Sequence, residues 1–131
     1  MIFVDTGAWF ALLIPDDTDH LAASGWLAQN RELLVTSDYV IDETLTLLKA
    51  RGQMSRALAS GRDAFAGRLA RIHYLSESEI RASWRTFASF TDKGWSFTDC
   101  TSKLIIDRLR IKRAFSFDDH FRQFGSVVVV P

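Results

Sequence analysis

The chain opens with four apolar residues, Met1 to Val4, which lead without polar alternation into Asp5. A continuous apolar run of this kind is typical of a strand buried on both faces, as in a parallel sheet covered by helices on each side. The chain then turns at Thr6-Gly7, and residues 8–13 are compatible with a helix. A carboxylate at the carboxyl end of a central strand lies where open α/β sheets form their ligand crevice. The opening stretch therefore predicts both a fold class and the place of a site.

Size and charge narrow the class of protein further. The 131 residues suit a single domain, 1–131, and 16 basic residues balance 16 acidic ones. Any binding of nucleic acid therefore needs a local basic patch. The single cysteine excludes an internal disulfide, and we find neither a signal peptide nor an apolar run approaching the ~20 residues that span a bilayer. We expect a cytoplasmic protein with no membrane association.

Strand and helix patterns alternate along the rest of the chain. Short apolar runs predict strands at residues 33–36, 72–75, 110–116 and 127–130, and helical spacing or capping signals predict helices at residues 20–29, 38–51, 55–71, 76–90 and 96–110. Such alternation is typical of a mostly parallel sheet with helices on both faces. The expected fold is a three-layer α/β/α domain with a mostly parallel five-stranded sheet.

Four carboxylates occupy special places in this pattern. Asp5 and Asp118 follow the first and fourth strands, Glu43 lies within an otherwise apolar helix, and Asp99 lies at a helix start. If the first and fourth strands are neighbours across a switch point, their carboxylates face one crevice, and Asp99 can line its rim. Asp99 also has a purely structural interpretation, because Ser96-x-x-Asp99 resembles a capping box.

Carboxylates gathered this closely repel one another unless a divalent cation neutralises them. Oxygen-only ligands suit Mg²⁺ or Mn²⁺, which also bind phosphate. The chemistry that this arrangement supports is metal-assisted hydrolysis of a phosphodiester, in which the metal activates a water molecule and stabilises charge on the phosphate.

The spaced set of motifs resembles the PIN-domain family and, at this chain length, the VapC-type ribonuclease toxins of toxin–antitoxin pairs. The resemblance covers essentially the whole chain. It depends on Val4-Asp5-Thr6, Glu43, Phe97-Thr98-Asp99, and the segment Phe115-Ser116-Phe117-Asp118-x-His120-Phe121 with Gly125. Gly7 departs from the pattern, because many relatives carry serine at that place.

The resemblance implies a Mg²⁺- or Mn²⁺-dependent endoribonuclease, with Asp5, Glu43 and Asp99 as core metal ligands. Asp118 would complete the site, with its neighbour Asp119 as the alternative fourth acid, and Thr6 or Ser116 would hold a water or phosphate oxygen. It also implies a homodimer and a VapB-like antitoxin partner bound against the early helices, where the candidate contacts are Trp9, Phe10 and Leu13. For at least two of these three residues, packing in the core is the stronger expectation. Transfer, ribosomal and messenger RNA remain open as substrates.

Two other functions compete with this interpretation. Asp5-Thr6-Gly7-Ala8 is also the fingerprint of aspartic proteases, but those enzymes are nearly all-β and would leave the other acids unexplained. The second alternative is a non-catalytic module of the same fold that binds RNA or a protein, for example through Arg62 and Arg68. For the nuclease, basic residues that could set specificity are Arg51, Arg56, Arg108 and Lys112.

Overall fold

The computed structural model describes all 131 residues and places the first strand, β1 (Ile2–Val4), at the centre of a five-stranded sheet. All three residues of β1 are fully buried, as the uninterrupted apolar run predicts. The strand order is β3-β2-β1-β4-β5, and every pair is parallel. The other strands are β2 (Leu34–Ser37), β3 (Arg71–His73), β4 (Arg113–Phe115) and β5 (Val128–Val130). The expected α/β class and five-stranded sheet are confirmed.

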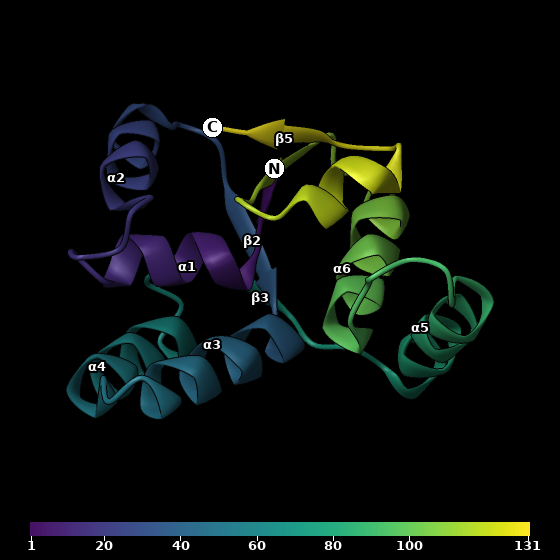
Figure 1. Cartoon of the computed structure of the whole chain (residues 1–131), viewed down its shortest axis with the longest axis horizontal. Coiled ribbons are helices and arrows are strands. Elements are labelled where there is room, and N and C mark those ends of the chain that lie inside the picture. Colours follow the sequence, from purple (N-terminus) through teal and green to yellow (C-terminus); the bar gives the residue numbers. More distant parts are fainter.

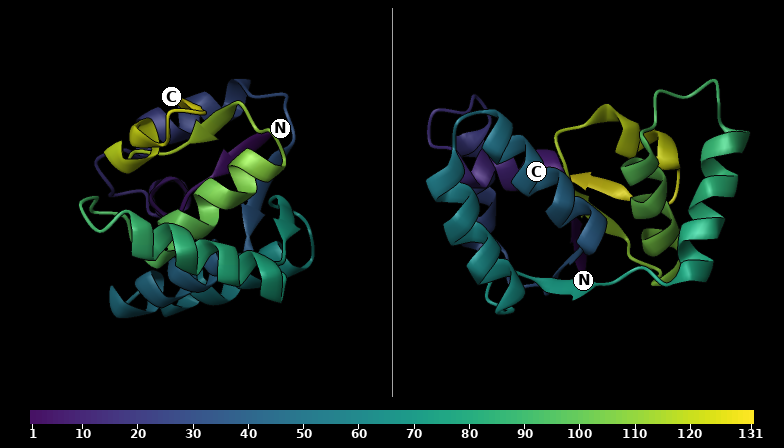
Figure 2. Two further views of the ribbon diagram at one scale, coloured as in Figure 1. Left: turned by 90° about the vertical axis from the view of Figure 1, so that its right-hand side faces the viewer. Right: turned by 90° about the horizontal axis from the view of Figure 1, so that it is seen from below.

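The helices gather on two sides of this sheet. Figure 1 shows α1 to α4 on one side of the strands and α5 and α6 on the other, and Figure 2 shows the same separation from below. They are α1 (Thr6–Leu13), α2 (His20–Gln29), α3 (Asp38–Ala50), α4 (Met54–Phe65), α5 (Glu77–Ser89) and α6 (Phe97–Arg108), with a 3₁₀ segment, η1 (Asp119–Phe124), before β5. None of these helices combines the length and apolar character required to cross a membrane.

The strand order contains a switch point between β1 and β4. From β1 the chain proceeds to β2 and β3 on one side, and it later returns to β4 and β5 on the other side. Val4 pairs with Phe115, so the residues that follow the two strands, Asp5 and Ser116, lie side by side. The backbone N–H of Asp5 donates to the carbonyl of Phe115 at 3.1 Å, which ties the two strand ends together. The predicted crevice therefore forms where open α/β sheets bind ligands.

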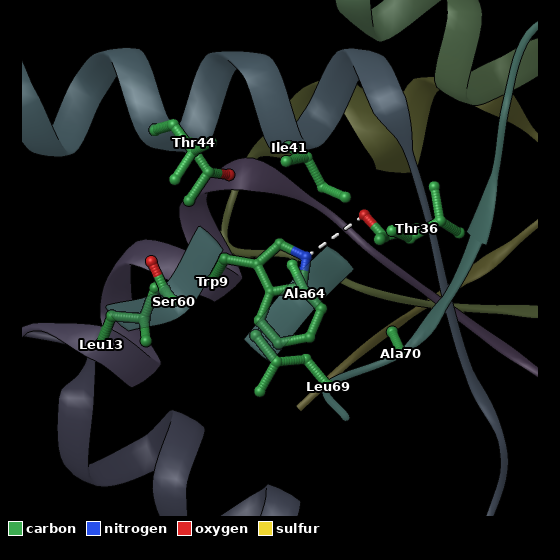
Figure 3. A pocket seen from close by; sticks show the side chains of 11 residues that line it. Trp9, Leu13, Thr36, Ile41, Thr44, Ser60, Ala64, Leu69 and Ala70 are labelled. Carbon is green, nitrogen blue, oxygen red and sulfur yellow. Dashed lines mark hydrogen bonds between the residues drawn. The ribbon is translucent and has the colours of Figure 1, made fainter. Parts of the chain in front are cut away.

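Trp9 packs beneath α3 rather than at the surface. Figure 3 shows its ring among the side chains of α3, α4 and β2, where its indole Nε1 donates to Thr36 Oγ1 at 3.2 Å. Only 7% of Trp9 is exposed, and Leu13 lines the same small apolar cavity. Of the three residues expected at a partner surface, Trp9 is therefore a core residue, and Leu13 and Phe10 are partly buried.

The predicted helix over residues 55–71 is too long. Helix α4 ends at Phe65, and Gly67 then adopts a left-handed backbone with φ of +74° before β3 begins at Arg71. Glycine tolerates this conformation because it lacks a Cβ, so Gly67 is the residue that ends the helix. The regular spacing of arginines up to Arg71 favours a longer helix. The third strand accordingly begins one residue before the predicted start and ends at His73.

Serine side chains begin α3, α5 and α6. Ser37 Oγ accepts from the Val40 backbone N–H, and both Ser76 and Ser96 form complete capping boxes with the acid three residues later. In α5 the Ser76 Oγ accepts from the Glu79 N–H, and Glu79 Oε1 accepts from the Ser76 N–H. Each box satisfies backbone donors that a helix start leaves without partners.

Replacing Ser76 with alanine should lower the free energy of unfolding by about 0.5–2 kcal/mol, because the Glu79 N–H loses its acceptor. A shift of this size corresponds to a fall of several degrees in melting temperature, measurable by calorimetry. Ser55→Ala is the matched control, since Ser55 is exposed in the first turn of α4 and does not cap that helix. Equal melting temperatures for the two variants would contradict the assignment of the cap.

Candidate metal centre

A groove opens at the carboxyl ends of β1 and β4, between α1, α3 and the start of α6. Its lining is dominated by carboxylates from segments far apart in the sequence. Every acid proposed from sequence lines it, together with two that were not: Asp5, Asp17, Asp19, Glu43, Asp99, Asp118 and Asp119. The fold therefore brings all the predicted acids to one surface of the protein.

Asp5 is the deepest of these acids, with 5% of its surface exposed. Burial raises the pKa of this carboxyl from 3.8 to about 7, and the nearby charges of Asp99 and Asp118 also raise it. Hydrogen bonds from the Thr6 backbone and from the Ser116 hydroxyl act in the opposite direction. Ser116 Oγ donates to Asp5 Oδ2 at 3.0 Å, so the side chain after β4 orients the carboxylate after β1.

Asp99 combines the two roles that its sequence position indicates. Its Oδ2 accepts from the Ser96 backbone N–H at 2.9 Å, which closes the capping box of α6. The same oxygen lies 3.1 Å from His120 Nδ1. These contacts hold the carboxylate in one orientation, and its other oxygen has no hydrogen-bond partner. A capping residue can thus also present an oxygen to the groove.

Asp118 and Asp119 differ sharply in environment. Asp118 Oδ1 accepts from the His120 backbone N–H at 2.9 Å and lies 3.4 Å from His120 Nδ1, beside Asp99. The side chain of Asp119 is 93% exposed and lies 3.6 Å from Arg122. Asp99, Asp118 and His120 each place one potential ligand atom within 4.8 Å of the others. This geometry favours Asp118 as the fourth acid.

Glu43 and Thr6 complete the groove. Glu43 lies on α3, half-buried, with no hydrogen bond or ion pair to neutralise its charge. Thr6, at the start of α1, is buried, and its Oγ1 has no hydrogen-bond partner. A buried hydroxyl without a partner is costly, so this oxygen is suited to a ligand or water in the groove. A Cβ at Gly7 would lie 4.0 Å from Asp5 Oδ2, so a serine side chain would fit at this position.

Sequence reasoning gave no site role to three residues of this groove, His120, Asp17 and Asp19. His120 belongs to the quoted motif, but only its contacts with Asp99 and Asp118 reveal its part in the site. Asp17 and Asp19 come from the loop before α2, and Asp19 occupies the N-cap position of α2 without a side-chain hydrogen bond. Arg51 lines the groove as well, a position that the end of α3 determines.

The other candidate basic residues are engaged elsewhere or lie outside the groove. Arg108 lies 3.5 Å from Glu79, and Arg56 donates to the Leu13 carbonyl at 3.1 Å. Arg68 pairs with Asp63 at 2.9 Å. Neither Arg62 nor Lys112 lines the groove. Arg51 is therefore the one candidate among them that the fold places beside the acids.

The parallel α/β sheet and the carboxylates at its switch point define a class of α/β proteins whose crevice suits a divalent metal with oxygen ligands. The aspartic-protease alternative is inconsistent with this fold, because Asp5-Thr6-Gly7 runs directly into α1. The chain belongs to the PIN-domain family, whose model matches residues 2–126.

Individual relatives agree with this assignment. The chain is 30% identical over 131 residues to a protein of Mycobacterium tuberculosis named 23S rRNA-specific endonuclease VapC20, covering 100% of this chain and 99% of that one. It is 29% identical over 122 residues to a VapC ribonuclease of Archaeoglobus fulgidus, covering 90% of this chain and 77% of the relative. The crystal structure of VapC20, described as a sarcin–ricin loop cleaving toxin, matches with a TM-score of 0.92 over the whole of both chains at 29% identity. The structure of FitAcB from Neisseria gonorrhoeae matches with a TM-score of 0.71 at 17% identity, over 100% of this chain and 97% of that one, and supports the fold alone.

Replacing Asp5 with asparagine should stabilise the metal-free protein at alkaline pH. The folded-state pKa lies above the unfolded value, so the stability linked to the protonated carboxyl is present below about pH 4 and is lost as the pH rises through about 7. Asparagine does not titrate. In EDTA, the free energy of unfolding of Asp5→Asn should therefore be higher than that of the unaltered protein by roughly 2–4 kcal/mol at pH 8, and the difference should be smaller toward pH 5.

Denaturant unfolding at several pH values measures this difference. Asp42→Asn, on the exposed face of α3, is the control for removal of one carboxylate and should remain within about 0.5 kcal/mol of the unaltered protein. A variant at Asp5 that is less stable than the unaltered protein at pH 8 would contradict the electrostatic account of this site.

Proposed function

We propose that this chain is a metal-dependent endoribonuclease and the toxin of a VapBC-type toxin–antitoxin pair. The observation that carries the proposal is the convergence of Asp5, Asp99 and Asp118 at the β1–β4 switch point, with Glu43 on the facing helix. Membership of the PIN-domain family and the endonuclease names of the relatives support it.

The donor set fits Mg²⁺ or Mn²⁺, because the groove offers carboxylate oxygens, which hard cations prefer. Asp5, Asp99, Asp118 and Glu43 would hold the ion. When bound, such an ion supplies an activated water and stabilises negative charge on the phosphate. Ser116 and the capping-box N–H of Ser96 keep Asp5 and Asp99 oriented, so the carboxylates need little rearrangement to bind.

The three supporting residues predicted from sequence, Thr6, Ser116 and Asp119, have different roles in this scheme. The unpartnered Thr6 hydroxyl can donate to a phosphate oxygen or to a water in the groove. The Ser116 hydroxyl is already engaged with Asp5, so its role is to position that carboxylate. Asp119, exposed and directed toward Arg122, is dispensable for metal binding in this scheme.

The substrate that we propose is a loop of 23S ribosomal RNA. This rests on the relative with 30% identity over the whole chain, whose name specifies 23S rRNA and whose structure is described as cleaving the sarcin–ricin loop. We further propose a homodimer, a VapB-like antitoxin that covers the partly exposed side of α1 near Phe10, and action in the cytoplasm, where ribosomal RNA is found.

The paired acids at 118 and 119 provide a direct test of cleavage. Asp118→Asn should lower the rate of cleavage of a sarcin–ricin hairpin RNA in Mn²⁺ by at least about 100-fold, since it removes a metal ligand. Asp119→Asn removes the same charge one residue away and should keep nearly full activity. Electrophoresis of end-labelled RNA measures both. RNA binding by the unaltered protein without cleavage, unaffected by Asp99→Asn, would instead favour the non-catalytic binding module.

Metal binding can be tested without any RNA. A ligand at ~100 times its Kd stabilises a protein by ~2.7 kcal/mol, which is several degrees for a domain of this size. The melting temperature of the unaltered protein and of Asp119→Asn should therefore rise by that amount from EDTA to millimolar Mn²⁺. The rise should shrink markedly in Asp118→Asn. Equal responses in all three proteins would contradict the proposed ligand set.

A further inference from the structure

The groove that holds the acids contains one arginine, Arg51, and otherwise only His120 as a basic side chain. Seven carboxylates face the same space, so a polyanionic RNA meets strong repulsion there unless cations offset it. The metal site offsets this charge near Asp5, whereas Arg51 is the permanently charged group contributed by the protein itself. We infer that Arg51 binds an RNA phosphate that flanks the scissile one, farther along the groove from the metal site. This inference rests on the proposed nuclease function.

The end of α3 places Arg51 in the groove. Glu43, Leu47 and Arg51 recur every four residues along one face of the helix, and all three line the groove. Arg51 is therefore roughly 12 Å from Glu43 along the helix axis, beyond the metal site but on the same wall. The helix stops at this point because Gly52 adopts a left-handed backbone with φ of +72°, and the Arg51 N–H still donates to the Leu47 carbonyl. The backbone that carries the side chain is thus well anchored.

The side chain is held by an aromatic ring rather than by a carboxylate. The guanidinium carbon of Arg51 lies 5.9 Å from the centroid of the Phe10 ring, within the range of a cation–π contact. Arg51 forms no ion pair with any of the groove acids. Without an ion pair or a side-chain hydrogen bond, the guanidinium keeps its donors available, and its planar edge can bind phosphate oxygens in a bidentate manner.

Arg51 also has a purely structural interpretation. A cation at the carboxyl end of a helix stabilises it through the helix dipole, and Arg51 caps α3. Lys49 provides the matched control, because it carries the same charge in the last turn of the same helix but lies outside the groove. A role at the helix end predicts equal effects of the two residues, whereas a phosphate contact predicts an effect of Arg51 alone.

The experiment compares Arg51→Gln, Arg51→Lys and Lys49→Gln in cleavage of a synthetic sarcin–ricin hairpin RNA with Mn²⁺, over a series of salt concentrations. Arg51→Gln should raise KM about tenfold with kcat little changed, and should lower the slope of log KM against log salt by about 0.7, the value for one phosphate contact on single-stranded RNA. Arg51→Lys should keep the salt slope of the unaltered protein. Its KM should lie between those of the unaltered protein and Arg51→Gln, since an ammonium lacks the planar fork of a guanidinium. Lys49→Gln should change neither quantity.

Phe10→Leu tests the stacking contact independently. It should raise KM in the protein that carries Arg51 and have a much smaller effect in the Arg51→Gln background, because the two residues act together. Equal KM values and salt slopes for Arg51→Gln and Lys49→Gln would overturn the inference while leaving the nuclease proposal intact. Absence of cleavage of both the hairpin and total RNA by the unaltered protein would overturn the proposed function, and the inference with it.

Discussion

The structure depends above all on holding several carboxylates together at one end of a buried sheet. Removing a carboxylate from water disfavours its charged form, and neighbouring negative charges add to this cost. Asp5 experiences both effects, which is why burial and the charges of Asp99 and Asp118 raise its pKa to about 7. The residues of β1 before Asp5 are apolar and fully buried. Their burial contributes favourable free energy of folding that offsets the cost of placing the carboxylates together.

Hydrogen bonds between distant segments hold these acids in place. Ser116 connects the end of β4 to Asp5, and the capping box of α6 fixes Asp99 while His120 joins it to Asp118. The hydrogen bonds of Ser116, Ser96 and His120 thus stabilise the fold and also orient the candidate metal ligands.

The groove presents acids and an arginine at different places on its wall. Asp5 and Asp118 follow β1 and β4, whereas Arg51, near the Phe10 ring, lies two turns along α3 from Glu43. A phosphate chain lying in this groove would meet both the candidate metal ligands and the guanidinium of Arg51. The regular spacing of helix α3 determines this separation, so one element contributes both an acid and a counter-charge.

The sequence by itself determined the fold class and the list of candidate acids. The apolar run before Asp5, the alternation of strands and helices and the capping signals are local patterns, and local chemistry is enough to recognise them. The helical spacing of basic residues also predicted that the fourth helix continues to residue 71. In the structure α4 ends at Phe65, because Gly67 adopts a left-handed backbone. Only the tertiary structure decided that Asp118, rather than Asp119, lies beside Asp99 and that His120 contacts both. It also decided that Arg51 lines the groove, whereas Arg108 pairs with Glu79. These facts concern side chains that are far apart in the sequence and meet only in the folded chain. The register of β1 against β4 and the packing of α3 beside them set which side chains meet, and no single stretch of the chain encodes either.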